Sequence, residues 1–163
     1  MRASLSDLLK VLPGARMTAN ASIDGVSTNS KAVAKGNLFV ALRGERFDAH
    51  EFLPEVVAQG AAAVIVERAF EGFSLPALMV SDTRHALGQI ANFWRRQFDT
   101  PVIGVTGSNG KTTVKEMIAS IFAAAFGEGN YLSTRGNLNN EIGVPLTLLG
   151  WNLPTALPWL KWA

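Results

Sequence analysis

Three short apolar runs stand out along the first half of the chain, at residues 38–42, 63–66 and 77–80. Each run is uninterrupted by polar residues and is too short to form a buried helix of ordinary length. Polar or glycine-containing segments bound all three runs. The pattern therefore predicts three strands, the first of them buried.

Helix signals lie between and around these runs. The segment 4–7 can cap a short helix that Pro13-Gly14 would end, and residues 47–60 are helix-like up to Gly60. After the third run, Ser81-Asp82-Thr83 is a good N-cap for a helix that reaches Phe98, whose aromatic residues we expect to pack on the sheet. Strands and helices alternate, so residues 1–99 are predicted to form a small α/β domain.

A second domain is predicted to begin at residue 100 and to occupy residues 100–149. Pro101 stops the preceding helix, and residues 102–105 restart the chain as a fully apolar strand. A glycine loop and an amphipathic helix follow; the apolar positions that predict one buried helix face are Val114, Met117, Ile118, Ile121 and Phe122. Because only one strand precedes this helix, we also expect the edges of that strand and the apolar face of the helix to be uncovered.

The glycine loop has the features that phosphate binding requires. Two glycines let backbone N–H groups approach an anion at the positive end of a helix, and the ammonium of Lys111 can reach the terminal phosphates of a nucleotide as the catalytic cation. The hydroxyl of Thr112 can hold Mg²⁺. The predicted ATP-binding residues are Gly107, Ser108, Asn109, Gly110, Lys111, Thr112 and Thr113. The loop departs from the general motif at Val105, where glycine is usual; the alternative is a glycine turn with a solvated lysine.

Composition and charge exclude several classes of protein. The chain has 15 Lys+Arg against 13 Asp+Glu and no basic tract, so a nucleic-acid partner is not expected. Without cysteine it has no disulfides, no thiol catalysis and no cysteine zinc site. No stretch reaches the ~20 apolar residues of a membrane span, and the N-terminus lacks the apolar run of a signal peptide. We therefore expect a cytoplasmic protein without membrane contact, and a monomer.

Three blocks of sequence resemble one family, the Mur ligases of peptidoglycan synthesis. Two are TGSNGKTTVKEM at 106–117 and TRGNLNNEIGVPLTLL at 134–149. The third, STNSKAVAKGNLFVALRGERFDAHEF at 27–52, is similar to the segment with which the family holds its UDP-sugar. The resemblance extends from about residue 23 to residue 149. It implies a UDP-sugar-binding N-terminal α/β domain, followed by the first strand, loop and helix of a central P-loop domain.

The resemblance also implies a reaction. Mur ligases transfer the γ-phosphate of ATP, with Mg²⁺, to the carboxylate of a UDP-N-acetylmuramoyl-peptide, and an amine then attacks the acyl phosphate. The member that this chain resembles most adds D-alanyl-D-alanine to the tripeptide. The block at 136–143 argues against another Mur ligase or a folylpolyglutamate-type ligase, and a nucleotide-binding or UDP-sugar-binding module without catalysis stays open as a different class.

Site residues follow from the same resemblance. Ser30 and Lys31 would lie near the uridine diphosphate, although this chain has Asn29 where the family usually has aspartate. His50 matches a position near the substrate, but a lone histidine is more often a satisfied core residue, and His85 has no metal-ligand spacing. The residues matching the block that faces the sugar-peptide are Thr134, Asn137, Asn139 and Asn140. Taken alone, such an asparagine-rich stretch is more often a turn held by side-chain to backbone bonds.

The last fourteen residues break the pattern. Residues 150–163 contain three of the four tryptophans and two prolines. The family continues beyond this point with a strand that carries a glutamate in a context like Val-Glu-Met-Gly. A reading frame that starts on the third base of each codon can give the same four residues from the codons of residues 159–163. We therefore interpret 150–163 as an out-of-frame tail, and expect no ligase turnover from this chain alone.

Overall fold

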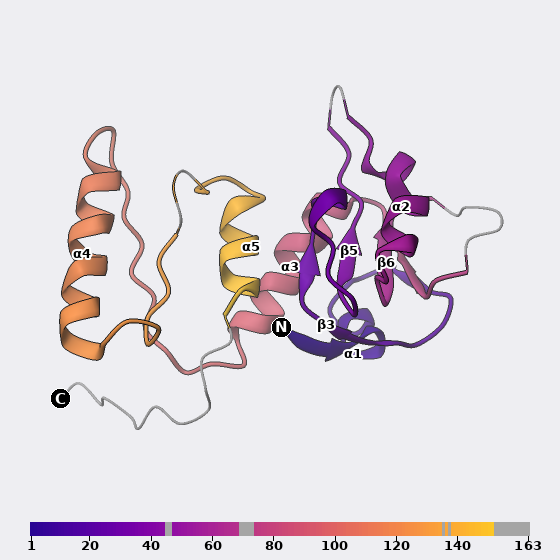
Figure 1. Cartoon of the computed structure of the whole chain (residues 1–163), viewed down its shortest axis with the longest axis horizontal. Helices are drawn as coiled ribbons and strands as arrows, with labels where there is room; N and C mark the ends of the chain where they lie inside the picture. Colours follow the sequence, from indigo (N-terminus) through magenta and orange to yellow (C-terminus); the bar gives the residue numbers. More distant parts are fainter. Residues whose placement is uncertain (45–46, 69–73, 135, 137, 152–163) are drawn as a thin grey trace.

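The computed structural model describes residues 1–44, 47–68, 74–134, 136 and 138–151. The first half of the chain forms a five-stranded sheet with the strand order β2-β7-β6-β5-β4, and its strands β5 and β6 are labelled in the right-hand part of Figure 1. The strands are β2 (Arg16–Met17), β4 (Val26–Ser27), β5 (Leu38–Val40), β6 (Ala63–Val66) and β7 (Ala77–Met79). β4 to β7 run parallel, and β2 pairs antiparallel with β7 at one edge. The predicted α/β fold class is confirmed.

The three predicted strands form β5, β6 and β7. All residues of β5 and β6 are buried, as expected for central parallel strands that are covered on both faces. Successive residues of a strand point to opposite faces, so Leu38 and Ile65 enter one apolar core and Phe39 and Val64 enter another. The sheet is therefore the middle layer of a three-layer sandwich.

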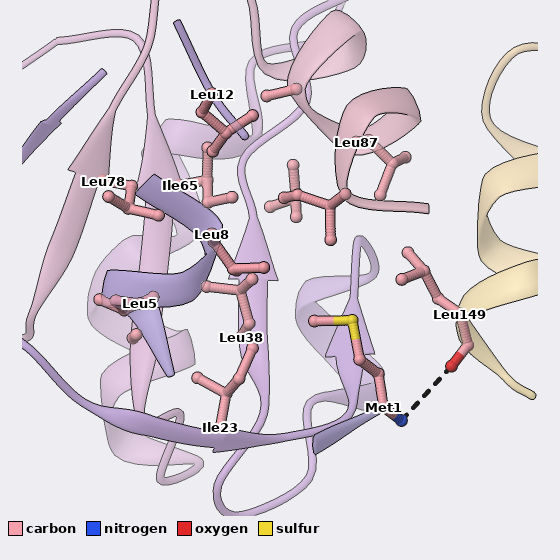
Figure 2. Close-up of a cluster of buried hydrophobic side chains, with 14 of the residues drawn as sticks. Met1, Leu5, Leu8, Leu12, Ile23, Leu38, Ile65, Leu78, Leu87 and Leu149 are labelled. Atoms are coloured by element: carbon pink, nitrogen blue, oxygen red, sulfur yellow. Dashed lines mark hydrogen bonds between the residues drawn. The ribbon is translucent and has the colours of Figure 1, made fainter. Parts of the chain in front are cut away.

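Helices cover both faces of the sheet. The 3-10 helix η2 (Ala49–Phe52) and α2 (Leu53–Ala58) pack on the face of Phe39. α1 (Leu5–Leu9) and α3 (Thr83–Arg95) pack on the opposite face, where they enclose the larger core (Figure 2). A small antiparallel pair, β1 (Arg2–Ser4) and β3 (Ser22–Asp24), adjoins this core, and η1 (Ser30–Ala32) follows β4. The domain thus places its strand-end loops on a rigid, buried framework.

Both predicted helix caps are present. Ser4 caps α1 in a capping box with Asp7, and its hydroxyl lies 2.6 Å from a carboxylate oxygen of Asp7. Hydrogen bonds from Ser4 and Lys10 lower the pKa of Asp7 to about 2. Asp82 caps α3 by accepting the backbone N–H of His85 at 2.8 Å. The helices end earlier than predicted, α1 at Leu9 and α3 at Arg95.

The second half of the chain contributes two helices. α5 (Gly143–Leu149) packs along α3 beside the larger core, where Leu149 is buried. The N-terminal ammonium of Met1 donates to the carbonyl of Leu149 at 3.4 Å, as Figure 2 shows. α4 (Lys111–Phe126) lies at the opposite end of the molecule from the sheet (Figure 1).

The packing prediction for the aromatic residues at the end of α3 is confirmed for Phe93 and Trp94 but not for Phe98. Phe93 and Trp94 are half-buried against the larger core. Phe98 lies beyond the helix and stacks on Trp151, with ring centroids 5.6 Å apart, while the indole N–H of Trp94 donates to the carbonyl of Trp151 at 2.9 Å. These side chains therefore join α3 to the segment that follows α5. Gly150 and Trp151 are the described part of the tail; residues 152–163 lie outside the described residues.

The predicted strand at residues 102–105 is wrong. This segment has no regular structure, and Val102 and Ile103 are 58% and 55% exposed. A buried parallel strand needs a neighbouring strand to accept its hydrogen bonds, and the described residues between 101 and 151 contain none. The apolar face of α4 is uncovered for the same reason, with Met117 62% and Ile121 63% exposed. The predicted helix and the expected exposure of its apolar face are both confirmed.

Candidate functional site

The loops that follow the parallel strands meet at one edge of the sheet. Because β4 to β7 run in the same direction, their carboxyl ends lie together, which is where open α/β sheets bind ligands. A cavity of about 230 Å³ is found at this edge. Its lining is polar and comes from the segments after β5, β6 and β7: Arg43, Asp48, His50, Glu67, Arg68 and Ser81. We refer to it as the sheet-edge pocket.

His50 is the buried centre of this pocket. Its side chain is 2% exposed, its Nδ1 lies 2.5 Å from Oδ1 of Asp48, and its Nε2 accepts the backbone N–H of Glu67 at 3.0 Å. A ring nitrogen that accepts this N–H carries no proton, so Nδ1 carries the proton and donates to Asp48. His50 is thus the satisfied core residue that the sequence favoured, and it fastens the loop after β5 to the end of β6.

Some charged side chains of the pocket have partners within it, and one, Arg43, is directed to no partner among the described residues. Burial raises the pKa of Asp48, but hydrogen bonds from His50 and the nearby charge of Arg68 outweigh it and hold that pKa below its usual value. Glu67 accepts the backbone N–H and the hydroxyl of Thr83, both at 3.0 Å, and so supports the start of α3. Within the described residues, no partner is found for the exposed guanidinium of Arg43. The pocket therefore presents a cation that an anionic ligand can engage.

Ser30 and Lys31 lie after β4, next to the pocket's loops in strand order. Asn29 caps η1 by accepting the N–H of Lys31 at 3.0 Å, and the carbonyl of buried Ser30 accepts from Gln59 at 2.7 Å. The side chain of Lys31 is exposed. The amide of Asn29 thus performs the capping that an aspartate could also perform, so the departure from the family pattern leaves the loop's conformation intact.

The predicted ATP-binding residues form the loop that leads into α4 and the first turn of that helix, and all of them except Lys111 are exposed. Gly110 is the N-cap with φ +76°, and Gly107 has φ +145°, conformations that favour glycine. The ammonium of Lys111 donates to the carbonyl of Gly107 and, at 3.4 Å, to that of Ser108, while Thr112 and Thr113 are exposed. The first turn of a helix of this length directs free N–H groups outward. The geometry fits a bound phosphate group.

Hydrogen bonds hold the block that begins at Thr134 at two points, Thr134 and Asn140. The carbonyl of Thr134 accepts from the ammonium of Lys115 on α4 at 2.7 Å. Oδ1 of Asn140 accepts the N–H groups of Ile142 and Gly143 at 3.2 and 2.7 Å, the side-chain to backbone bonding expected of an asparagine turn. Asn139 is exposed. Asn137 lies outside the described residues.

Several residues of the site were not named individually from the sequence. Arg43 and Asp48 belong to the block at 27–52 that resembles the UDP-sugar segment, whereas Arg68 joins them only because the sheet topology brings distant loops together. Arg84 joins two of these regions, since its guanidinium donates to Glu141 and to the carbonyl of Arg43. Only the sequence Asp48-Ala49-His50 carried a local hint, because residues two apart can bond within one turn.

No group of three or more His, Asp or Glu side chains is close enough to hold a metal ion within the part of the chain that the structure describes. Thr112, the predicted Mg²⁺ ligand, is exposed in the first turn of α4. None of the helices in the described ranges has the length and apolar character needed to cross a membrane.

Comparisons with known proteins agree with this geometry. A model described as "Mur ligase family, catalytic domain" matches residues 22–95, and one described as "Mur ligase middle domain" matches residues 105–152. The "UDP-N-acetylmuramoyl-tripeptide--D-alanyl-D-alanine ligase" of Escherichia coli (strain K12) is 48% identical over 146 residues, which cover 90% of this chain and 31% of that protein.

Solved structures give the same result. MurF from Acinetobacter baumannii superposes with a TM-score of 0.82 at 40% identity, covering 93% of this chain and 34% of that one. MurF ligase from Thermotoga maritima, in complex with ADP, superposes with a TM-score of 0.68 at 35% identity, covering 79% and 30%. The chain thus spans about a third of the length of the relatives it matches. On both its sequence and its fold, it belongs to the Mur ligase family.

Proposed function

We propose that this protein acts in an ATP-dependent ligase reaction that adds D-alanyl-D-alanine to a UDP-N-acetylmuramoyl-tripeptide. The γ-phosphate of ATP would pass to the peptide carboxylate with release of ADP. The amine of D-alanyl-D-alanine would then attack the acyl phosphate, form the amide bond and release phosphate. The identity to relatives of this name supports the proposal, and we propose a cytoplasmic location because ATP and UDP-sugars are the substrates assumed.

One observation carries the nucleotide part of the proposal. The residues from Gly107 to Gly110 form an exposed loop that opens α4, and Lys111, Thr112 and Thr113 are the first residues of the helix. Backbone N–H groups and an ammonium at this place stabilise phosphate charge, which is the main task in phosphoryl transfer. Thr112 is the residue that would hold Mg²⁺, which neutralises phosphate charge when it is bound with the nucleotide.

The UDP-sugar part rests on the sheet edge. We propose that the diphosphate is met by Arg43 of the sheet-edge pocket and by Ser30 and Lys31, because these residues follow adjacent parallel strands. Residues 1–99 would form this UDP-sugar domain, and residues 100–149 the start of the ATP domain. The Asn139-Asn140 turn, which is tied to the start of α5, would then face the sugar-peptide.

Two separate titrations test these assignments. ATP with Mg²⁺ and UDP-N-acetylmuramoyl-tripeptide are titrated against the chain by calorimetry. Lys111→Ala should weaken ATP binding about tenfold or more and leave the UDP-sugar unaffected, while Arg43→Gln should do the reverse. Lys35→Ala and Arg96→Gln, at exposed positions away from both sites, are the matched controls. Equal affinities in Lys111→Ala and Lys35→Ala would refute the phosphate loop.

A second candidate function is a binding module without catalysis. The uncovered apolar face of α4 and the absence of a strand at residues 102–105 favour it for this chain as it is described. ADP release is measured in the presence of the UDP-muramoyl-tripeptide, with and without D-alanyl-D-alanine. Release that depends on the dipeptide would establish the ligase; binding of both nucleotides without release would establish the module.

A further inference from the structure

The guanidinium of Arg84 connects two segments that are far apart in the sequence. Arg84 lies in the first turn of α3; its NH1 is 2.5 Å from Oε1 of Glu141, and its NH2 is 3.2 Å from the carbonyl oxygen of Arg43. These partners are 57 and 41 residues away. One planar side chain with several fixed donors can hold two acceptors at once, which a lysine does less well.

Both partners of Arg84 lie at the proposed substrate site. Arg43 contributes to the sheet-edge pocket. Glu141 directly follows Asn140, whose side chain fixes the turn to the N–H groups of Ile142 and Gly143. Arg84 therefore joins the pocket to residues 139–141, which we call the asparagine turn.

The framework that carries Arg84 is firm. Glu67 accepts two hydrogen bonds from Thr83, and Asp82 caps the same turn, so the first turn of α3 is fixed to the sheet edge. The loop of Arg43 is held by backbone contacts of its own. Arg43 and Asp48 form an isolated antiparallel β-bridge, and the N–H of Gly44 donates to the carbonyl of Phe47 at 2.7 Å. The asparagine turn is the segment that depends more on Arg84.

We propose that Arg84 is a positioning residue, which holds the turn at Asn140 and Glu141 beside the loop after β5 so that both segments meet one ligand. This inference rests on the proposed function, in which the ligand is the UDP-muramoyl-tripeptide. The Arg84 and Glu141 side chains are 39% and 65% exposed, and an exposed ion pair contributes little to global stability. Removing it should therefore move the turn without unfolding the chain.

Amide hydrogen exchange tests the positioning role in the absence of any ligand. In Arg84→Gln, exchange at Ile142 and Gly143 should become about two- to fivefold faster, the factor that corresponds to one exposed ion pair. Arg84→Lys should recover part of the protection. Arg96→Gln, at the C-cap of the same helix and away from the turn, is the matched control and should change neither amide. Unchanged exchange at both amides in Arg84→Gln would overturn the proposal.

Ligand affinities test what the position is for. Arg84→Gln should weaken UDP-N-acetylmuramoyl-tripeptide about two- to fivefold and leave UDP unchanged, because UDP does not reach the turn. An equal loss for both ligands indicates a general structural role and overturns the proposal. If the unaltered chain binds neither ligand, the proposed function fails, while the exchange at Ile142 and Gly143 still decides whether Arg84 holds the turn.

Discussion

Replacing Gly143 with alanine tests whether the turn at Leu138 is packed against the first residue of α5. Gly143 is buried, and a Cβ built there would lie 2.6 Å from both the carbonyl carbon and the Cα of Leu138. Carbon atoms in favourable contact are about 3.5–4.0 Å apart. Because the opposing atoms are backbone, a side-chain rotation cannot relieve the overlap, and the turn itself must move.

The magnitude follows from two opposing terms. Overpacking of this kind costs about 1–3 kcal/mol, and replacing glycine with alanine inside a helix gains up to about 1 kcal/mol, less at a helix end. We therefore expect Gly143→Ala to lose about 1–2 kcal/mol of unfolding free energy. Gly88→Ala in α3 is the matched control: nothing lies within 4 Å of its Cβ position, so it should gain about 0.5–1 kcal/mol.

Urea unfolding, followed by far-ultraviolet circular dichroism, measures both variants. The same chemical change should separate their unfolding free energies by about 1.5–3 kcal/mol, and amide exchange at Ile142 should rise in Gly143→Ala alone. Equal stability of the two variants, or a gain in Gly143→Ala, would refute the close approach of Leu138 to α5.

Three further outcomes are expected. The folded chain holds the pKa of the Asp48 carboxyl below its unfolded value of 3.8. The ionised Asp48 therefore stabilises the folded state fully above pH 3.8, and this contribution is lost as the pH falls through the lowered pKa. An acid titration of stability should therefore be flatter at its acidic end in Asp48→Asn. Leu87→Ala, at a fully buried position of the larger core, should cost about 2–5 kcal/mol in urea unfolding. Met117→Gln and Ile121→Gln should each change stability by less than about 0.5 kcal/mol, and a larger loss would mean that the face of α4 is covered.

The fold of the first hundred residues could be predicted because its signals are local. β5 and β6 are uninterrupted apolar runs, and Asp82 caps α3 with its own side chain. Alternation of strand and helix then leaves a parallel sheet as the simplest arrangement. The antiparallel edge strand β2 was missed, because two residues are too few to give a periodic pattern.

The second half shows where such reasoning stops. The run at residues 102–105 has the composition of a buried strand, and α4 has the periodicity of a helix with one buried face. A pattern reports what a segment can bury, whereas burial itself needs a partner surface. The described residues supply no partner strand, so Val102 and Ile103 stay exposed while α4 forms from its own hydrogen bonds.

The two candidate sites differ in the same way. The glycine loop before α4 was predictable because Gly110 at the helix start and Lys111 next to it are neighbours in the sequence; its role in ATP binding stays a prediction. The segment 27–52 was also identified from the sequence, but its contacts with the segments after β6 and β7 were not, because His50 meets Glu67 only when β5 and β6 are paired. A motif therefore finds a local loop, whereas an arrangement built by several loops requires the topology.

This difference has a consequence for how the two sites respond to change. The sheet-edge pocket rests on β5 and β6, whose residues are all buried, and on the start of α3, which Glu67 supports directly. Its geometry should therefore persist as long as the larger core is folded. The phosphate loop rests on α4, whose apolar face is exposed, so its geometry depends on one helix and on the bond between Lys115 and Thr134. Opening of that helix costs little compared with opening of the sheet. Under the proposed function, ligand binding at the predicted phosphate loop would also have to order the loop, and this cost would lower the affinity for ATP relative to the UDP-sugar.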